Sequence, residues 1–120
     1  MANQGGYVSR IWTDQATTST TAYRSNRISM LKGSLLSLQL EMTGTVTGTF
    51  TLWQSNMPDA DPTSDADWVE NTDVTFTAVS NATDQFINIG NAAARWYMVK
   101  YTNATGTGSL NGWVMAGKGA

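Results

Sequence analysis

Cysteine and histidine are both absent from the 120 residues of this chain. The absence of cysteine excludes disulfide bonds and thiolate metal sites. Without histidine as well, the chain lacks the usual transition-metal ligands, an imidazole general base and a cysteine nucleophile. The side chains left for chemistry are Asp, Glu, hydroxyls and a few Lys and Arg. We therefore predict a protein without enzymatic activity, bound metal or cofactor.

Charge is also scarce. Only 13% of the residues are charged and the net charge is −2, against about a quarter charged in typical soluble domains. The seven basic residues are scattered and form no stripe, which argues against nucleic-acid binding. No apolar run approaches the ~18 residues of a membrane helix, and the first residues lack the regions of a secretory signal. We therefore expect no nucleic acid, membrane or small-molecule substrate as a partner.

Threonine and strand-like alternation dominate what is present. The 18 threonines make up 15% of the chain, and this β-branched, wettable residue suits the exposed faces of strands. Apolar and polar residues alternate with period two, as half-buried strands require. The alternating segments are 34–42, 49–55, 73–79, 86–89, 95–101 and 110–115. In the first of these, four apolar side chains share one face: Leu36, Leu38, Leu40 and Met42.

Segments rich in Gly, Thr, Asn and Pro separate these strands. We predict turns at 43–48 and 102–108 and a long loop at 56–67, with no amphipathic helix of useful length. Strands at this spacing predict an all-β fold, an antiparallel two-sheet sandwich of the jelly-roll or immunoglobulin-like type with about seven or eight strands. A single open sheet would leave long unpaired edges, so two layers are favoured.

Residues 1–33 differ in composition from the sandwich domain that we expect over residues 34–120. This first third is polar and carries four of the seven basic residues. Within it lies a short apolar island beside an arginine, the composition of an interface hot spot. Its candidate partner-interface residues are Tyr7, Val8, Arg10, Ile11 and Trp12. Two alternatives stay open: an extended arm over about residues 1–20 that reaches a neighbouring subunit, or edge strands of the same domain.

An acidic segment follows the second alternating strand. Six of the nine acidic residues lie between Asp59 and Asp73. Four spaced carboxylates could supply oxygens to calcium, but the EF-hand spacing is missing, and Asp and Pro are the residues that an exposed turn selects. We therefore favour a solvated loop over a cation site. The acids share one loop instead of facing each other across a cleft, which argues against a glycosidase.

The five tryptophans allow two interpretations. Such rings could form a sugar-stacking platform, but a small sandwich also needs large side chains in its core, where each aromatic ring buries about 150–250 Å². We predict core positions for Trp68 and Trp96. Trp53 lies opposite Phe50 and Leu52 in the alternation. We therefore predict that Trp53 is on the surface, as a further partner-interface residue.

One hairpin resembles a known family. Residues 50–59 read FTLWQSNMPD, and a short loop later comes Asp67-Trp68-Val69. The segment 95–101 and the turn Gly106-Thr107-Gly108 complete the pattern. Over residues 48–116 this arrangement resembles the small β-sandwich virion proteins of tailed bacteriophages. Met57-Pro58 stands where that family often has Asp directly after Ser-Asn, so we expect a loop of different shape.

The resemblance implies a structural virion protein, foremost a capsid decoration or cement protein, made in the bacterial host cytoplasm and carried on the capsid surface. It implies contacts with the major capsid protein and with copies of itself, as a homotrimer. Two alternatives stay open. One is a carbohydrate- or receptor-binding module of a fibre or tail, with Trp53 and the acidic loop as its contact surface. The other is a ring-forming neck or tail component.

Overall fold

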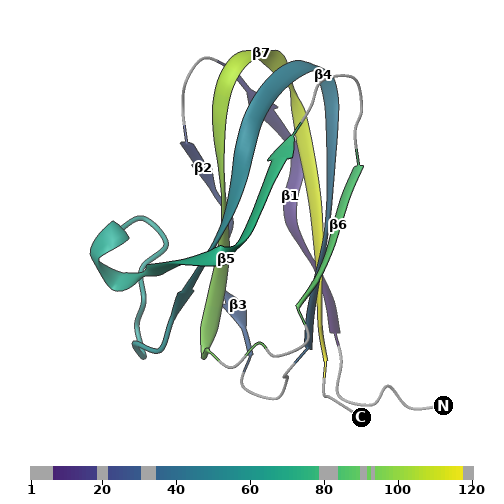
Figure 1. The fold of residues 1–120 in the computed structure, drawn as a ribbon. Helices are drawn as coiled ribbons and strands as arrows, with labels where there is room; N and C mark the ends of the chain where they lie inside the picture. The colour runs from purple at the N-terminus through teal and green to yellow at the C-terminus, as the bar shows by residue number, and fades with distance from the viewer. Residues whose placement is uncertain are drawn as a thin grey trace, which may run out of the picture.

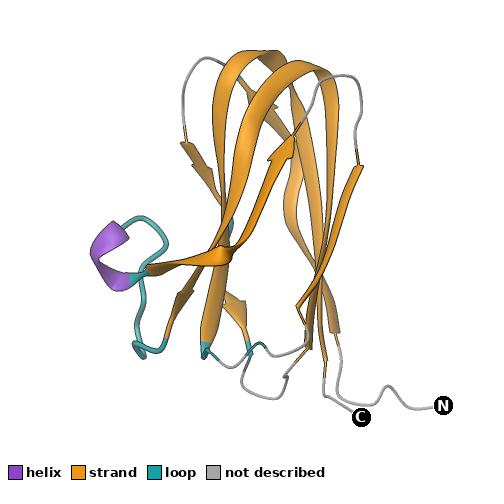
Figure 2. Ribbon diagram, viewed as in Figure 1, coloured by secondary structure: helices purple, strands orange, loops and turns teal. Residues whose placement is uncertain are grey.

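The computed structural model describes residues 7–18, 22–30, 35–78, 84–89, 92 and 94–117. Within these ranges the chain forms seven strands and one turn of 3-10 helix, η1 (Figures 1 and 2). The elements are β1 (Tyr7–Thr17), β2 (Ala22–Arg24), β3 (Ile28–Ser29), β4 (Leu35–Ser55), η1 (Asp65–Asp67), β5 (Val69–Ala78), β6 (Asp84–Ile89) and β7 (Trp96–Gly117). The all-β prediction is confirmed. In the described part of the chain, no helix is long and apolar enough for a membrane span.

Two long strands organise the molecule. β4 and β7 pair antiparallel along their whole length, from Leu35 opposite Gly117 to Ser55 opposite Trp96. Figure 1 shows that both strands arch over together, so that the two halves of the ribbon face each other. One continuous hydrogen-bonded sheet is thereby folded into the two layers of a sandwich.

Shorter strands widen each layer. Layer A consists of β1, the second half of β7, the first half of β4, and β6, in that order. Layer B consists of β2 and β3, the first half of β7, the second half of β4, and β5. Since all pairings are antiparallel, the prediction of an antiparallel sandwich holds, with the two layers sharing their central strands.

The arch is made by segments that we predicted to be turns. Residues 43–48 and 102–108 are instead the bent middles of β4 and β7, and they pair with each other. Gly44 and Gly106 have φ of 91° and 85°, in the region that favours glycine. A Cβ on Gly106 would lie 1.7 Å from the carbonyl oxygen of Thr45. The threonines between the glycines favour extended backbone, so the strands bend without ending.

The core lies between the layers. The face predicted for 34–42 is confirmed, since Leu36, Leu38, Leu40 and Met42 are all at most 2% exposed. From layer B, Phe50 packs against Tyr101 with ring centroids 4.8 Å apart. The hydroxyl of Tyr101 donates to Asn103 Oδ1 at 2.8 Å, and burial raises the pKa of Tyr101 above 10.0.

The N-terminal strands belong to the same sheet as the rest of the chain. β1 pairs with β7 from Tyr7 opposite Ala116 to Thr17 opposite Gly108, and β2 and β3 pair with the other half of β7. For these residues the edge-strand alternative fits and the arm does not, because strand pairing with β7 supplies the order that their composition alone could not. Residues 1–6 lie outside the described residues.

Candidate functional site

The acidic loop between β4 and β5 folds back onto the outer face of layer B. Trp68 and Ala60 are buried there against Met98 of β7, and Trp53 and Trp96 pack around them. The indole of Trp68 donates to the carbonyl of Asp61 at 2.8 Å, and that of Trp96 donates to the carbonyl of Met57 at 3.0 Å. A second small hydrophobic cluster therefore fixes the loop to the sheet.

Basic side chains hold the loop from the sheet side. Arg24 Nη2 lies 2.8 Å from a carboxylate oxygen of Asp65, and Lys100 Nζ lies 3.4 Å from the same atom. Arg24 also donates to the carbonyl of Pro62, and Arg27 to that of Ala60. Asp59, Asp61 and Asp65 are exposed, as the prediction of a solvated loop requires. The structure adds that these cations and the buried indole of Trp68 anchor the loop to the sheet.

Three of the loop carboxylates, those of Asp61, Asp65 and Asp67, already have partners within the chain. The hydrogen bond from Arg24 is the main cause that holds the pKa of Asp65 below 3.8. The backbone N–H and the hydroxyl of Thr63 lower the pKa of Asp61. The backbone N–H of Asp61 donates to Asp67 Oδ2 at 2.9 Å. In the described ranges, no group of three acidic residues is placed to hold a metal ion.

Cations lie over two tryptophan rings on the outer side of layer B, Trp53 and Trp96. Lys100 Nζ lies 4.6 Å from the ring centroid of Trp53. The guanidinium of Arg27 lies 4.4 Å from the ring of Trp96, and that of Arg95 lies 5.5 Å from it. Trp53 is half-buried, as a surface position allows. The core prediction for Trp96 is wrong, because this ring lies at the rim of the second cluster, outside the space between the layers.

The outer face of layer A carries the other group of exposed apolar side chains. Val8 is 67% exposed, Met115 50% and Phe86 63%. Leu35 also lies at this end of β4 and is 40% exposed. Beside them the guanidinium of Arg10 lies 4.6 Å from the ring centroid of Trp113 and donates to Asn111. We call this surface the A-face: Val8, Arg10, Leu35, Gln39, Glu41, Phe86, Trp113 and Met115.

The structure separates the predicted interface residues. Val8 and Arg10 lie on the A-face, whereas Ile11 and Trp12 are 8% and 6% exposed and belong to the core. A register shift between Arg10 and Trp12 turns both consecutive apolar residues inward. Trp53 lies on layer B. The side chain of Tyr7 lies outside the described residues. A partner surface at Val8, Arg10 and Trp53 stays a prediction, and Ile11 and Trp12 are not accessible to a partner.

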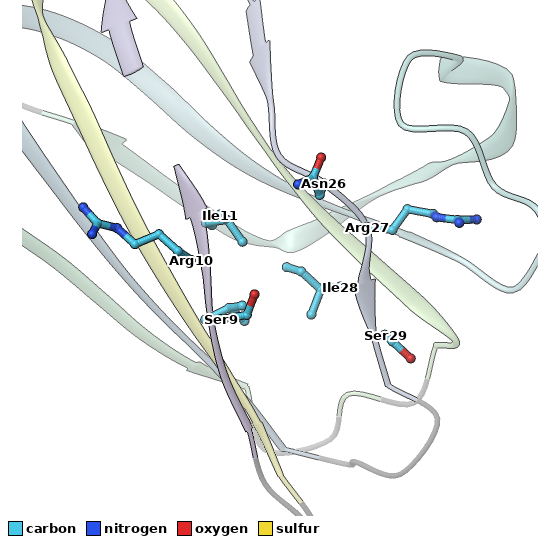
Figure 3. Close-up of a pocket in the computed structure, with 8 residues that line it drawn as sticks. Ser9, Arg10, Ile11, Asn26, Arg27, Ile28 and Ser29 are labelled. Atoms are coloured by element: carbon cyan, nitrogen blue, oxygen red, sulfur yellow. The ribbon is translucent and has the colours of Figure 1, made fainter. Parts of the chain in front are cut away.

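A cavity of 280 Å³ lies between the edge strands of the two layers, β1 and β3 (Figure 3). Its lining combines apolar residues with short polar side chains: Ser9, Ile11, Asn26, Ile28, Ser29 and Val114. Arg10 and Arg27 border it, but Figure 3 shows their side chains directed away from it. The side chains that face this hollow are thus uncharged, and the charged groups of this edge serve the A-face and the loop.

Comparison with known proteins establishes the fold. No family model and no curated protein matches the chain. Among solved structures, PBSX exported protein XepA matches the whole chain with a TM-score of 0.66 at 16% identity. SPBc2 prophage-derived protein YomS matches over 97% of this chain and 99% of its own, with a TM-score of 0.53 at 11% identity. A structure of infectious bursal disease virus (Gx strain) matches 92% of the chain, with a TM-score of 0.55 at 10% identity.

The chain spans 40% of the length of XepA and 31% of the matched viral chain. It therefore corresponds to one sandwich within those longer chains, and to nearly all of YomS. At sequence identities of 10–16%, what this chain shares with these three structures is the fold.

Proposed function

We propose that the protein is a non-enzymatic structural component of a phage virion. The observation that carries the proposal is the shared fold with a prophage-derived protein, YomS, over nearly the full length of both chains. The sequence resemblance of residues 48–116 to small virion sandwiches of tailed phages supports it independently. The viral structure that matches most of the chain is consistent with such a role.

Within the virion, we propose the role of a capsid decoration protein that binds the major capsid protein on the outside of the assembled shell. A ligand that binds an assembled state and not its parts stabilises that state by mass action. Cementing therefore needs only a rigid domain with an adhesive surface. The folded-over sheet supplies the rigid domain. Exposed apolar side chains of the kind that mark protein contacts also lie outside the A-face, at Met57 of the loop and Val69 of β5.

The proposal is tested with particles made by a phage whose copy of the gene is deleted. Purified protein is added back, and unbound protein is removed on a density gradient. We expect the protein to sediment with the particles and to raise the temperature at which they release DNA. Protein that stays at the top of the gradient, with no change in that temperature, would contradict the decoration role.

A further inference from the structure

We propose that the A-face binds the A-face of a second copy of this chain across a twofold axis. The inference deepens the proposed function by naming a partner surface, and it replaces the homotrimer that the resemblance implies with a twofold dimer. Its solution test does not depend on a virion role. The occupant is identified by the pattern of charge and apolar side chains that the strand register fixes on this face.

Opposite charges lie apart on the A-face. Arg10 is opposite Trp113 and, one strand further, Gln39. Glu41 is opposite Asn111 on one side and Asp84 of β6 on the other, so the acidic end of the face has two acidic positions. Glu41 is therefore two strands across and two residues along from Arg10. Among the described residues the ion pairs join Asp65 to Arg24 and Lys100, so neither Arg10 nor Glu41 has an opposite charge beside it. A second copy can supply the missing charge to both.

The apolar side chains repeat the same displacement. Met115 is opposite Ser37, and Phe86 is opposite Gln39 on the far side of β4. Phe86 is therefore also two strands across and two residues along from Met115, in the same direction. With strands ~4.8 Å apart and a rise of ~3.4 Å per residue, each displacement is about 12 Å.

One axis satisfies both pairs. A twofold axis between two facing sheets reflects the pattern of one face onto the other. Met115 lies one strand across and two residues along from Arg10, a step of ~4.8 Å by ~6.8 Å. This step is perpendicular to the ~12 Å step that joins Arg10 to Glu41 and Met115 to Phe86, so the four positions form a rectangle. The line midway between Arg10 and Glu41 is therefore also the line midway between Met115 and Phe86.

Applied to a second copy, this axis brings Arg10 against the partner's Glu41 and Met115 against the partner's Phe86, each twice. It passes beside Trp113, so this half-buried indole meets its own counterpart. Such self-complementarity is what an isologous contact requires.

The size of the face sets the strength of the contact. Four strands by about seven residues cover roughly 450 Å² per copy, or about 900 Å² for both, which is at the small end of specific interfaces. We therefore expect dissociation in solution on the order of tens of micromolar. Many copies held on one particle would strengthen such a contact through effective concentration.

The test is a charge exchange measured by sedimentation equilibrium between about 5 µM and 1 mM. Arg10→Glu and Glu41→Arg each place like charges in contact, and we expect each to weaken dimerisation by about tenfold or more. The double exchange restores the pair and should return the dissociation constant to within about threefold of the original. Asp73→Arg, the same charge change at an exposed residue of β5, is the matched control and should leave dimerisation unchanged.

Arg10 also stacks on Trp113 and binds Asn111, so thermal unfolding is measured for every variant, and Glu41→Arg keeps those contacts intact. A monomer throughout the concentration range, a trimer, or a dimer indifferent to both reversals would overturn the inference. Single reversals that the double exchange fails to rescue would overturn the proposed pairing.

Particle binding separates this inference from the proposed function. We expect Met115→Asn to weaken dimerisation. Binding to particles that lack the protein should persist in part, through other surfaces. If Met115→Asn abolished particle binding and left dimerisation unchanged, the A-face would bind the shell and the second copy would be the wrong occupant. If the protein dimerised as described but never bound particles, the dimer would stand and the virion role would fall.

Discussion

Replacement of Trp12 by alanine tests whether β1 belongs to the core. Trp12 is 6% exposed and lies 6.3 Å, centroid to centroid, from the ring of Phe50 in the opposite layer. An aromatic side chain buries about 150–250 Å², and at ~25 cal/mol per Å² this is worth about 4–6 kcal/mol, of which alanine keeps a minor part. We therefore expect Trp12→Ala to lower the free energy of unfolding by about 3–5 kcal/mol.

That loss is a large fraction of the free energy of unfolding of a whole domain, which is about 5–15 kcal/mol. At roughly 3–5 °C per kcal/mol for a chain of this size, the melting temperature should fall by about 10–25 °C. The assay is thermal and urea unfolding followed by far-UV circular dichroism, which does not depend on the fluorescence of the removed indole.

Val8→Ala is the matched control, because Val8 lies on the same strand and is 67% exposed. Its unfolding free energy should change by no more than about 0.5 kcal/mol. A Trp12→Ala protein that melts at the original temperature but fails to bind its partners would refute the core placement and restore the arm.

Three further outcomes follow from the arch, the loop and the ionisable groups. Gly106→Ala should cost about 2 kcal/mol or more of unfolding free energy in urea titrations, since φ is 85° and the added Cβ meets the Thr45 carbonyl; a stable variant would contradict the arch geometry. Trp68→Ala should release the loop, and limited proteolysis should then cut within residues 56–67 while the rest of the sheet stays resistant; equal resistance would contradict the anchoring role. Because the pKa of Asp65 is lowered in the fold, its contribution to stability is constant at neutral pH and is lost as pH falls below about 3.8; Asp65→Asn should flatten the acid limb of melting temperature against pH, and an unchanged limb would contradict the pairing with Arg24.

Strand alternation was the part of the fold that the sequence could predict. The face of Leu36 to Met42 follows from side-chain period alone, because a half-buried strand must alternate. The bent strands could not be predicted in this way. Gly-Thr segments are ambiguous locally, and at 43–48 and 102–108 the outcome is decided by pairing between positions about sixty residues apart.

The interface residues show a similar limit. The apolar island beside Arg10 suggested an interface anchor, but a bulge opposite β7 turns both Ile11 and Trp12 into the core. The A-face needed the pairing of four strands from distant parts of the sequence. Exposed positions such as Phe86 and Met115 become neighbours only when the register of β6, β4 and β7 is known.

Anchoring of the acidic loop likewise depended on tertiary contacts. The density of Asp between positions 59 and 67 favours an exposed turn on local grounds. The partners of those acids, Arg24 and Lys100, come from β2 and β7 and carry no local signal. The one local indication was Trp68, whose large apolar ring needed a place to be buried.

The central claim, a structural role in a phage particle, is tested most directly by counting copies of this chain in purified virions by quantitative mass spectrometry against the major capsid protein. The proposed role predicts a fixed ratio to the capsid subunit, at tens to hundreds of copies per particle, that survives gradient purification. Six or twelve copies would keep the virion role but move it to the neck or tail. Absence from purified particles, with the protein found only in the lysate, would contradict the structural role itself.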